Sequence, residues 1–326
     1  MRLTLGSHRA VAIVDADTGR REAGVELTNP SYVIPTPNGG ALYAVSENLE
    51  GPGAVHALAV DGAALRPLGT ARASRGHEPC HLSLVGDGHL LVSNYGDGVV
   101  AALPIAADGS LGEADSVVRH SGAGPDPKRQ DGPHAHQAVP APEGGWVLAC
   151  DLGTDEVVVY QWNRDRGLRR HGATRLAPGC GPRHLAFSPD GTRVYIAGEL
   201  NSRLEIGEWD AATGTLAPTG SLSTVAASAD GNHPSGVVVA VDGRVYLANR
   251  GDDSIAVIDP AAGDLIGTVP CGGAWPRDLC LSGDGRLFVA NERSGTVAAF
   301  ALTDALPVAR GTFDAPEVTS VRVLPG

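Results

Sequence analysis

Two histidines separated by one residue are the first candidates for chemistry in this sequence. His134 and His136 occur in "DGPHAHQAV" (131–139), after a Gly-Pro pair and before an apolar run. In a β-strand, residues i and i+2 point to the same side of the chain, so a strand here would present both imidazoles to one space. One histidine of such a pair could act as a general base. Together with His81 or His184, the pair could also bind zinc. The third alternative is that both side chains only pack in the interior.

A repeated unit must position these histidines. It consists of a proline, two residues, a short alternating strand, a turn around Asp-Gly or Asn-Gly, and a second strand. Clean copies occupy 79–95, 182–199, 234–250 and 276–292, and variants occupy 30–47 and 134–151. Alternation bounded by Asp-Gly favours a hairpin, and two further strands follow each copy. Four strands in each unit of about 42–56 residues are typical of a β-propeller blade.

Six copies leave both ends of the chain without partners. Residues 8–27 are interpreted as an outer hairpin and residues 318–324 as an inner strand. Together they would complete a seventh blade, and closing the ring would remove exposed sheet edges. The sequence therefore predicts one all-β domain over 1–326: a seven-bladed β-propeller with four antiparallel strands per blade, closed by strands from both termini.

Aligning the copies places two residues of each blade on one face of the predicted disc, because the first strand starts where the second ends. The first register is Tyr32, His81, His136, His184, Gly236 and Asp278, and the second is Glu47, Tyr95, Asp151, Glu199, Arg250 and Glu292. Hydrogen bonds to the neighbouring blade would explain any single one of these polar residues. A purely structural position would keep one residue type, so the variety indicates a functional site.

The charge and the cysteines limit the partners and the compartment. The formal net charge is −12, and Lys128 is the single lysine. Binding to nucleic acid or to an anionic membrane is therefore not expected. The sequence has five cysteines without C-x-x-C, no signal-peptide pattern and no apolar run of about 18 residues, which favours a reduced, cytoplasmic protein. Nothing in the composition indicates an oligomeric state.

Four stretches resemble the signature segments of the seven-bladed lactonase propeller family, which includes propeller-type 6-phosphogluconolactonases and the fungal carboxymuconate cycloisomerase. They are 122–139, 151–162, 181–202 and 248–257, and the resemblance runs from about 28 to 300. It implies an active site containing His134 or His136, Arg183 of G-P-R-H, Glu199 of A-G-E-L-N and Arg250 of A-N-R-G. It also implies a small lactone as the substrate.

Lactone hydrolysis needs a base for water, a donor for the oxyanion and groups that orient the ring. We assign the base to His134 or His136 and anion binding to Arg183 and Arg250; Glu199 would orient one of these groups or serve as the base itself. The sequence has no G-x-S-x-G elbow, so water attacks directly. Loop 120–133 is expected to lie over the mouth of the ring. The predicted substrate-binding residues are His81, Tyr95, Arg129, Gln130, Asp151, His184, Asn249, Arg277 and Glu292.

Several alternatives remain open. Glu47, Asp151 and Glu199 are a conceivable calcium site, but nearby arginines would repel a cation, so neither a metal nor another cofactor is expected. Trp275 would either stack on a sugar or fill space between blades. The leading function is a lactonase for a sugar lactone such as 6-phosphogluconolactone. The alternatives are a lactone-forming cycloisomerase and a non-catalytic binding propeller. A broad apolar patch on the outer surface would indicate the binding propeller.

Overall fold

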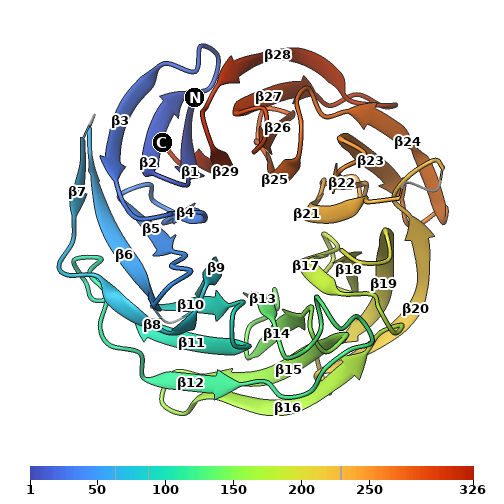
Figure 1. Cartoon of the computed structure of the whole chain (residues 1–326), viewed down its shortest axis with the longest axis horizontal. Coiled ribbons are helices and arrows are strands. Elements are labelled where there is room, and N and C mark those ends of the chain that lie inside the picture. The colour runs from blue at the N-terminus through green and yellow to red at the C-terminus, as the bar shows by residue number, and fades with distance from the viewer. Residues whose placement is uncertain (63, 87, 228–229) are drawn as a thin grey trace.

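The computed structural model describes residues 1–326 except 63, 87, 228 and 229, so Asp87 of one predicted Asp-Gly turn lies outside the described residues. Over these residues, the strands form seven antiparallel sheets arranged as a ring about a central axis (Figure 1). Short alternating segments separated by glycine turns produce this arrangement, as the repeat predicts. The predicted all-β seven-bladed propeller is confirmed.

Each blade runs outward from the axis. The first contains β29 (Val318–Leu324), β1 (Arg2–Ser7), β2 (Ala10–Asp15) and β3 (Arg21–Glu26). The second contains β4 (Val33–Pro35), β5 (Ala41–Ser46), β6 (Pro52–Asp61), β7 (Ala64–Pro67) and β8 (Arg72–His77). The third contains β9 (Pro79–Val85), β10 (His89–Asn94), β11 (Val99–Pro104) and β12 (Ser116–Arg119).

The remaining four blades follow the same order. The fourth contains β13 (Ala135–Pro140), β14 (Trp146–Asp151), β15 (Glu156–Asn163) and β16 (Gly167–Arg175). The fifth contains β17 (Pro182–Phe187), β18 (Arg193–Gly198), β19 (Arg203–Asp210) and β20 (Thr215–Ser223). The sixth contains β21 (His233–Val239), β22 (Val245–Arg250), β23 (Ser254–Asp259) and β24 (Asp264–Pro270). The seventh contains β25 (Pro276–Leu281), β26 (Arg286–Asn291), β27 (Thr296–Ala301) and β28 (Val308–Asp314).

Both ends of the chain close the ring, as predicted. The innermost strand β29 pairs antiparallel with β1, from Arg2 opposite Leu324 to Gly6 opposite Ser320, and β2 with β3 forms the outer hairpin. The Thr319 hydroxyl also donates a hydrogen bond either to Gly6 O or to Ser31 O, 3.1 and 2.8 Å away, which links this blade to the next. The termini therefore meet inside one sheet.

Removal of β29 is expected to prevent folding of the ring. A chain ending at Pro316 would leave β1 with an unpaired edge near the axis and would uncover Leu3 and Leu5, which share an apolar cluster with Val318 and Val321. Circular dichroism and size-exclusion chromatography should report a non-native, aggregation-prone chain. A chain lacking only Pro325 and Gly326, which follow β29, should remain folded. A well-folded monomer from the longer truncation would contradict this expectation.

The second blade departs from the predicted four strands. β6 is ten residues long and pairs with two short strands, β7 at its end and β8 at its start. The predicted fourth strand of this blade is therefore divided into two short strands, which together occupy its outermost position.

Bulges at the inner strands direct side chains toward the axis. In the described part of β9, β13, β17, β21 and β25, the pairing register shifts within the first residues of the strand. An extra residue in one strand re-aims the side chains around it. His136, Arg183, His184 and Arg277 all lie in such bulges.

The expectation that His134 and His136 point to the same side of one strand does not hold. His134 precedes β13, and His136 is the bulged residue of that strand.

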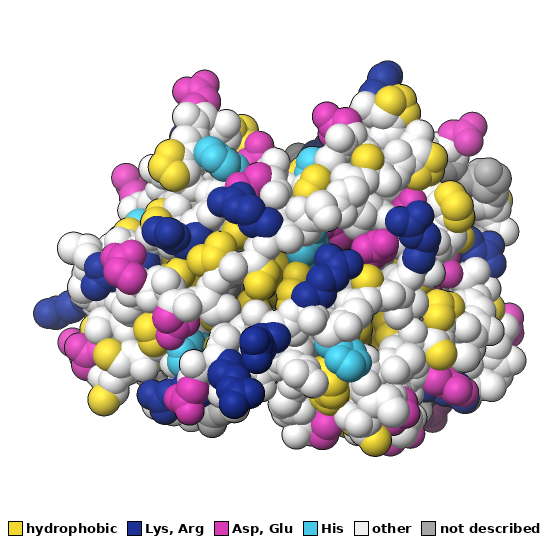
Figure 2. Space-filling view, turned by 90° about the horizontal axis from the view of Figure 1, so that it is seen from below, with side chains coloured by type: hydrophobic (Ala, Val, Ile, Leu, Met, Phe, Trp, Pro, Cys, Tyr) yellow, Lys and Arg dark blue, Asp and Glu magenta, His cyan; other side chains and the backbone are white. Residues whose placement is uncertain are grey.

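The core lies between adjacent blades and is built mainly from Val, Leu and Ala. One cluster joins Leu91 and Val100 of the third blade to Val147 and Tyr160 of the fourth. The five cysteines are buried free thiols, and Cys80, Cys150 and Cys280 pack in inner or second strands as small residues. On the outer rim, arginine and acidic side chains alternate over the face seen in Figure 2. This face therefore presents charges of both signs.

Candidate active site

Glu199 is the centre of a buried cluster of charges. It follows β18, and its carboxylate lies 2.6 Å from Arg129 Nη2, 3.1 Å from Arg183 Nε and 2.7 Å from Arg250 Nη2. Glu199 is 3% exposed, Arg183 2% and Arg250 7%. Three of the predicted catalytic residues, two from the fifth blade and one from the sixth, thus meet at one edge of the ring.

The Glu199 cluster has an excess of positive charge. Burial would raise the pKa of Glu199, but Arg250, Arg183 and Arg129 outweigh it and hold that pKa well below its usual range. Burial, together with the neighbouring charge of Arg250, lowers the pKa of Arg183 to about 9. Arg183 Nη1 is buried and has no hydrogen-bond partner among the described residues. The cluster therefore offers an unused donor and a field that favours an anion.

His134 has a fixed tautomer. Its Nδ1 lies 2.8 Å from the backbone oxygen of Tyr95, and its ring stacks on the Tyr95 ring with centroids 4.4 Å apart. A carbonyl oxygen only accepts hydrogen bonds, so a neutral His134 carries its proton on Nδ1 and leaves Nε2 with a lone pair. The side chain is 15% exposed, and Asp131 lies 3.6 Å from Nε2. This is the arrangement that a general base requires.

His81, His136 and His184 form a buried layer with Tyr32 near the axis. Ring centroids are 4.5 Å apart for Tyr32 and His81, 5.3 Å for His81 and His184, and 5.1 Å for His136 and His184. Burial lowers the pKa of each of the three imidazoles well below its usual range, and the charge of Arg183 adds to this effect. These histidines are therefore neutral at physiological pH.

Arg322 completes the axial layer and was not predicted. It lies on β29 and donates hydrogen bonds to the Asp278 carboxylate and the Tyr32 hydroxyl. With His184 it also lines a cavity of about 420 Å³ that extends along the inner strands. The sequence feature that could have indicated Arg322 is its position as the only charged residue in the strand "VTSVRVL". An arginine that faces the interior of a strand needs a buried acceptor for its hydrogen bonds.

Arg277 and Glu292 belong to a second charged group on the same edge. Arg277 lies 3.5 Å from Glu292 and 3.9 Å from Glu47, and Glu292 lies 3.0 Å from His8 Nε2. The predicted residues on this edge are therefore His134, Tyr95, Arg129, Arg183, Glu199, Arg250, Arg277 and Glu292, with His81, His136 and His184 deeper along the axis. His8 was missed because it lies in the turn between β1 and β2, outside the repeat.

Asp151 does not face the substrate space. It is fully buried, and one carboxylate oxygen lies 2.5 Å from His120 Nδ1. The other accepts the backbone N–H groups of His134 and Thr154 at 2.9 and 3.0 Å. Its predicted substrate-binding role is therefore corrected: Asp151 positions the backbone that carries His134. Glu47, Asp151 and Glu199, considered together as calcium ligands, each contact a different partner: Arg277, the backbone N–H of His134 and Arg250, respectively.

Gln130 and Asn249 are also corrected from substrate-binding to structural residues. Gln130 lies in loop 120–133 and is fully buried; its amide donates to Leu152 O at 2.8 Å and to Asp155 at 2.7 Å. Asn249 is fully buried, and its amide donates to Thr224 O at 2.7 Å and to Ser254 Oγ at 3.2 Å. A short polar side chain at a strand end is needed to satisfy such backbone groups. Arg129, by contrast, does extend from this loop to Glu199.

Replacing Gln130 with alanine is expected to destabilise the protein by about 1–3 kcal/mol, because buried backbone and carboxylate partners lose their donor. Loosening the loop should also move Arg129 away from Glu199. Denaturant unfolding would measure the first effect. The matched control is Q161A, at an exposed glutamine of β15, which should change the free energy of unfolding by less than about 0.5 kcal/mol. Equal stability of Q130A and the native protein would contradict the structural assignment.

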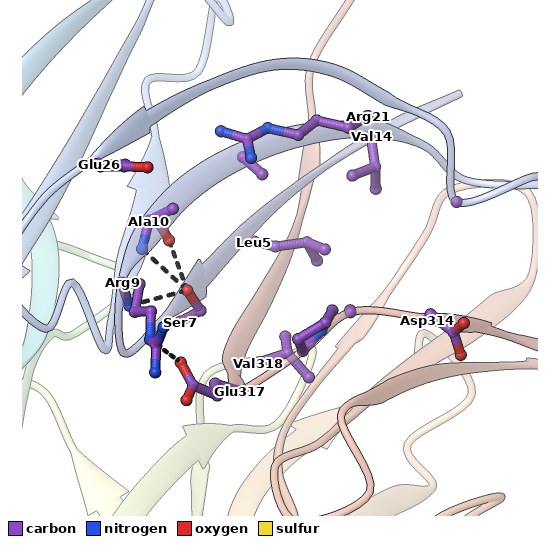
Figure 3. Close-up of a pocket in the computed structure, with 14 residues that line it drawn as sticks. Leu5, Ser7, Arg9, Ala10, Val14, Arg21, Glu26, Asp314, Glu317 and Val318 are labelled. Carbon is purple, nitrogen blue, oxygen red and sulfur yellow. Dashed lines mark hydrogen bonds and ion pairs between the residues drawn. The ribbon is translucent and has the colours of Figure 1, made fainter.

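A cavity of about 530 Å³ lies elsewhere, at the seam between the first and last blades (Figure 3). Leu5, Val14 and Val318 form its apolar wall, and Arg9 pairs with Glu317 at 2.9 Å on its edge. Its lining contains no histidine, so it lacks the base and the arginine cluster found beside Glu199. We therefore place the candidate site at the Glu199 edge of the ring.

The described residues contain no group of three or more His, Cys, Asp or Glu side chains arranged to hold a metal ion. The same part of the chain has no helix that is long and apolar enough to cross a membrane.

Comparisons with known proteins identify the family of this chain. The model of the family described as "Lactonase, 7-bladed beta-propeller" matches residues 15–323. A 6-phosphogluconolactonase of Bacillus subtilis is 33% identical over 311 residues, covering 91% of this chain and 88% of the relative. The periplasmic gluconolactonase of Pseudomonas aeruginosa superposes with a TM-score of 0.88 at 26% identity, covering 99% of both chains. This chain belongs to the seven-bladed β-propeller lactonase family.

Proposed function

We propose that this protein hydrolyses the lactone of a small anionic sugar, with 6-phosphogluconolactone as the leading substrate. The observation that carries the proposal is the Glu199 cluster, in which three guanidinium groups surround one carboxylate. An anionic substrate would balance the remaining positive charge, and guanidinium groups bind phosphate well. The relatives named as 6-phosphogluconolactonase and gluconolactonase support a sugar lactone as the substrate class.

In the proposed mechanism, Nε2 of His134 takes a proton from water as the water oxygen attacks the lactone carbonyl carbon. The unpartnered Nη1 of Arg183 then donates to the oxyanion of the tetrahedral intermediate. The carbon–oxygen bond of the ring breaks when the intermediate collapses, and the imidazolium returns its proton to the leaving alkoxide. Asp131, 3.6 Å from Nε2, stabilises the imidazolium between these steps. The product is the open-chain acid.

Other residues bind and orient the substrate. Arg250 and Arg129, both held by Glu199, bind its anionic group. The neutral layer of His81, His136 and His184 adds no positive charge that would compete for the oxyanion. We also propose a cytoplasmic location, because five buried thiols suit a reducing compartment.

The test is the rate of ring opening of 6-phosphogluconolactone and of unphosphorylated gluconolactone, after subtraction of spontaneous hydrolysis. We expect enzyme-dependent opening of both, with kcat/KM higher by about tenfold or more for the phosphorylated lactone, the equivalent of one charge-assisted contact. An Arg183→Met variant should lose about 10²–10³-fold in kcat. No acceleration of either lactone would overturn the proposal and favour the cycloisomerase or binding-propeller alternatives.

A further inference from the structure

Trp275 has an unfavourable backbone conformation. Its φ is +63°, in the left-handed region, and it immediately precedes Pro276 at the start of β25. Bulky residues rarely adopt positive φ, and a following proline restricts the backbone further. The backbone is held there by two hydrogen bonds: Trp275 N donates to Asp253 at 2.7 Å, and Trp275 O accepts from Glu292 N at 3.0 Å.

The blade, not the tryptophan, requires this conformation. In three other blades the residue before the equivalent proline also has positive φ: Asn29 at 43°, Glu78 at 51° and Gly181 at 59°. Glu78 O accepts a hydrogen bond from Tyr95 N at 2.9 Å, as Trp275 O does from Glu292 N. Glycine meets such a position without strain, as at Gly181. A tryptophan there therefore needs a compensating role for its side chain.

The Trp275 ring connects the Glu199 cluster to a cation at the surface. The guanidinium carbon of Arg250 lies 5.6 Å from the ring centroid, and that of Arg293 lies 3.3 Å from it. Both distances fall within cation–π range. Arg250 is the residue that pairs with Glu199, whereas Arg293 is exposed and forms no ion pair within the described part of the chain. One aromatic ring thus holds two guanidinium groups beside the site.

We propose that Trp275 is a positioning residue for Arg250, and that Arg293 with Arg250 forms the subsite for the substrate's distal phosphate. A guanidinium group can donate two parallel hydrogen bonds to the oxygens of a phosphate. Arg183 would serve the carbonyl end of the substrate, and the Arg250–Trp275–Arg293 stack would serve its other end. The inference rests on the proposed function, and it assigns the phosphorylated lactone as the specific substrate.

Three variants separate positioning from packing. W275G removes the ring and relieves the backbone, W275A removes the ring and keeps the strain, and E78G relieves the same strain at the equivalent position. We expect both Trp275 variants to lose about tenfold or more in kcat/KM, with W275G more thermally stable than W275A. E78G should keep kcat/KM within about twofold of the native value. Native activity in W275G, or a W275G protein less stable than W275A, would overturn the positioning role.

Arg293 is tested by substrate preference. R293A should lower kcat/KM for 6-phosphogluconolactone by about tenfold or more while leaving unphosphorylated gluconolactone within about twofold. R310A, at an exposed arginine of β28, is the matched control and should change neither. An equal loss for both lactones in R293A would overturn the subsite.

Binding of the product distinguishes the two proposals from each other. Isothermal titration calorimetry with 6-phosphogluconate should show binding that weakens by about tenfold in R293A, with gluconate much less affected. If the native protein binds 6-phosphogluconate in this way but opens no lactone, the subsite stands and the hydrolytic function fails. If it opens lactones but R293A leaves 6-phosphogluconate affinity unchanged, the function stands and the subsite fails.

Discussion

Replacing Glu199 with glutamine is expected to destabilise the protein by about 3–5 kcal/mol, the usual result of removing one partner from a buried ion pair. Arg183 and Arg250 would remain buried at 2% and 7% exposure without a counter-charge. Their mutual repulsion already contributes to the lowered pKa of Arg183. The same variant should lose most activity, because Arg129 and Arg250 are held in place by this carboxylate.

Guanidinium chloride unfolding and thermal unfolding would measure this effect, with E208Q at an exposed position of β19 as the control. The control should change stability by less than about 0.5 kcal/mol. Inorganic phosphate should raise the Tm of E199Q more than that of the native protein, since an anion can replace the missing carboxylate. An E199Q protein as stable as the native one would show that the arginines do not depend on Glu199.

The pH dependence of this stabilisation follows from the lowered pKa of Glu199. A carboxyl group whose pKa is lower in the folded state stabilises that state fully above its unfolded-state pKa. This stability is lost as the pH falls toward the folded-state pKa. The difference in stability between the native protein and E199Q should therefore be constant near neutral pH and shrink below about pH 4.

Replacing His134 with alanine is expected to lower kcat/KM by about 10²–10⁴-fold, the usual contribution of a general base. The variant removes an imidazole whose Nδ1 is held by the Tyr95 backbone oxygen, so that its lone pair is on Nε2. H136A should lose less, because His136 is buried and its lowered pKa keeps it neutral. The readout is kcat/KM on 6-phosphogluconolactone, measured for both variants and the native protein.

The size of the loss separates the two histidines. The loss in kcat/KM should be clearly larger in H134A than in H136A, because only the base takes the proton from water. Circular dichroism would establish that both variants are folded. A larger loss in H136A than in H134A would move the role of the base to His136. His134 would then be left as a stacking partner of Tyr95.

The repeat made most of the fold predictable. The spacing of the Asp-Gly hairpins and the unpaired ends indicated seven blades and the closure by β29. The register of Arg183, Glu199 and Arg250 placed them on one edge, where they contact each other. The extra strand of the second blade was not predictable, because β7 and β8 share β6 only through its unusual length.

Side-chain direction was the part that the sequence could not supply. Asp151 and Asn249 lie at the predicted edge, yet both turn into their blade to satisfy backbone groups. Gln130 belongs to the predicted loop, but its amide holds that loop together. Bulges shift the inner strands by one or more residues, and a periodic pattern does not encode such shifts. Arg322 was missed because it comes from a strand outside the six copies.

The closure by β29 also fixes when the site can exist during biosynthesis. Strands β1, β2 and β3 leave the ribosome before the strands of the other six blades, but the inner strand of their blade, residues 318–324, is made after all of those strands. Arg322, which anchors Asp278 and Tyr32 on the axis, arrives with that strand. A nascent chain therefore carries an open edge until β29 is made, and a product terminated before β29 lacks the arginine that completes the axial layer.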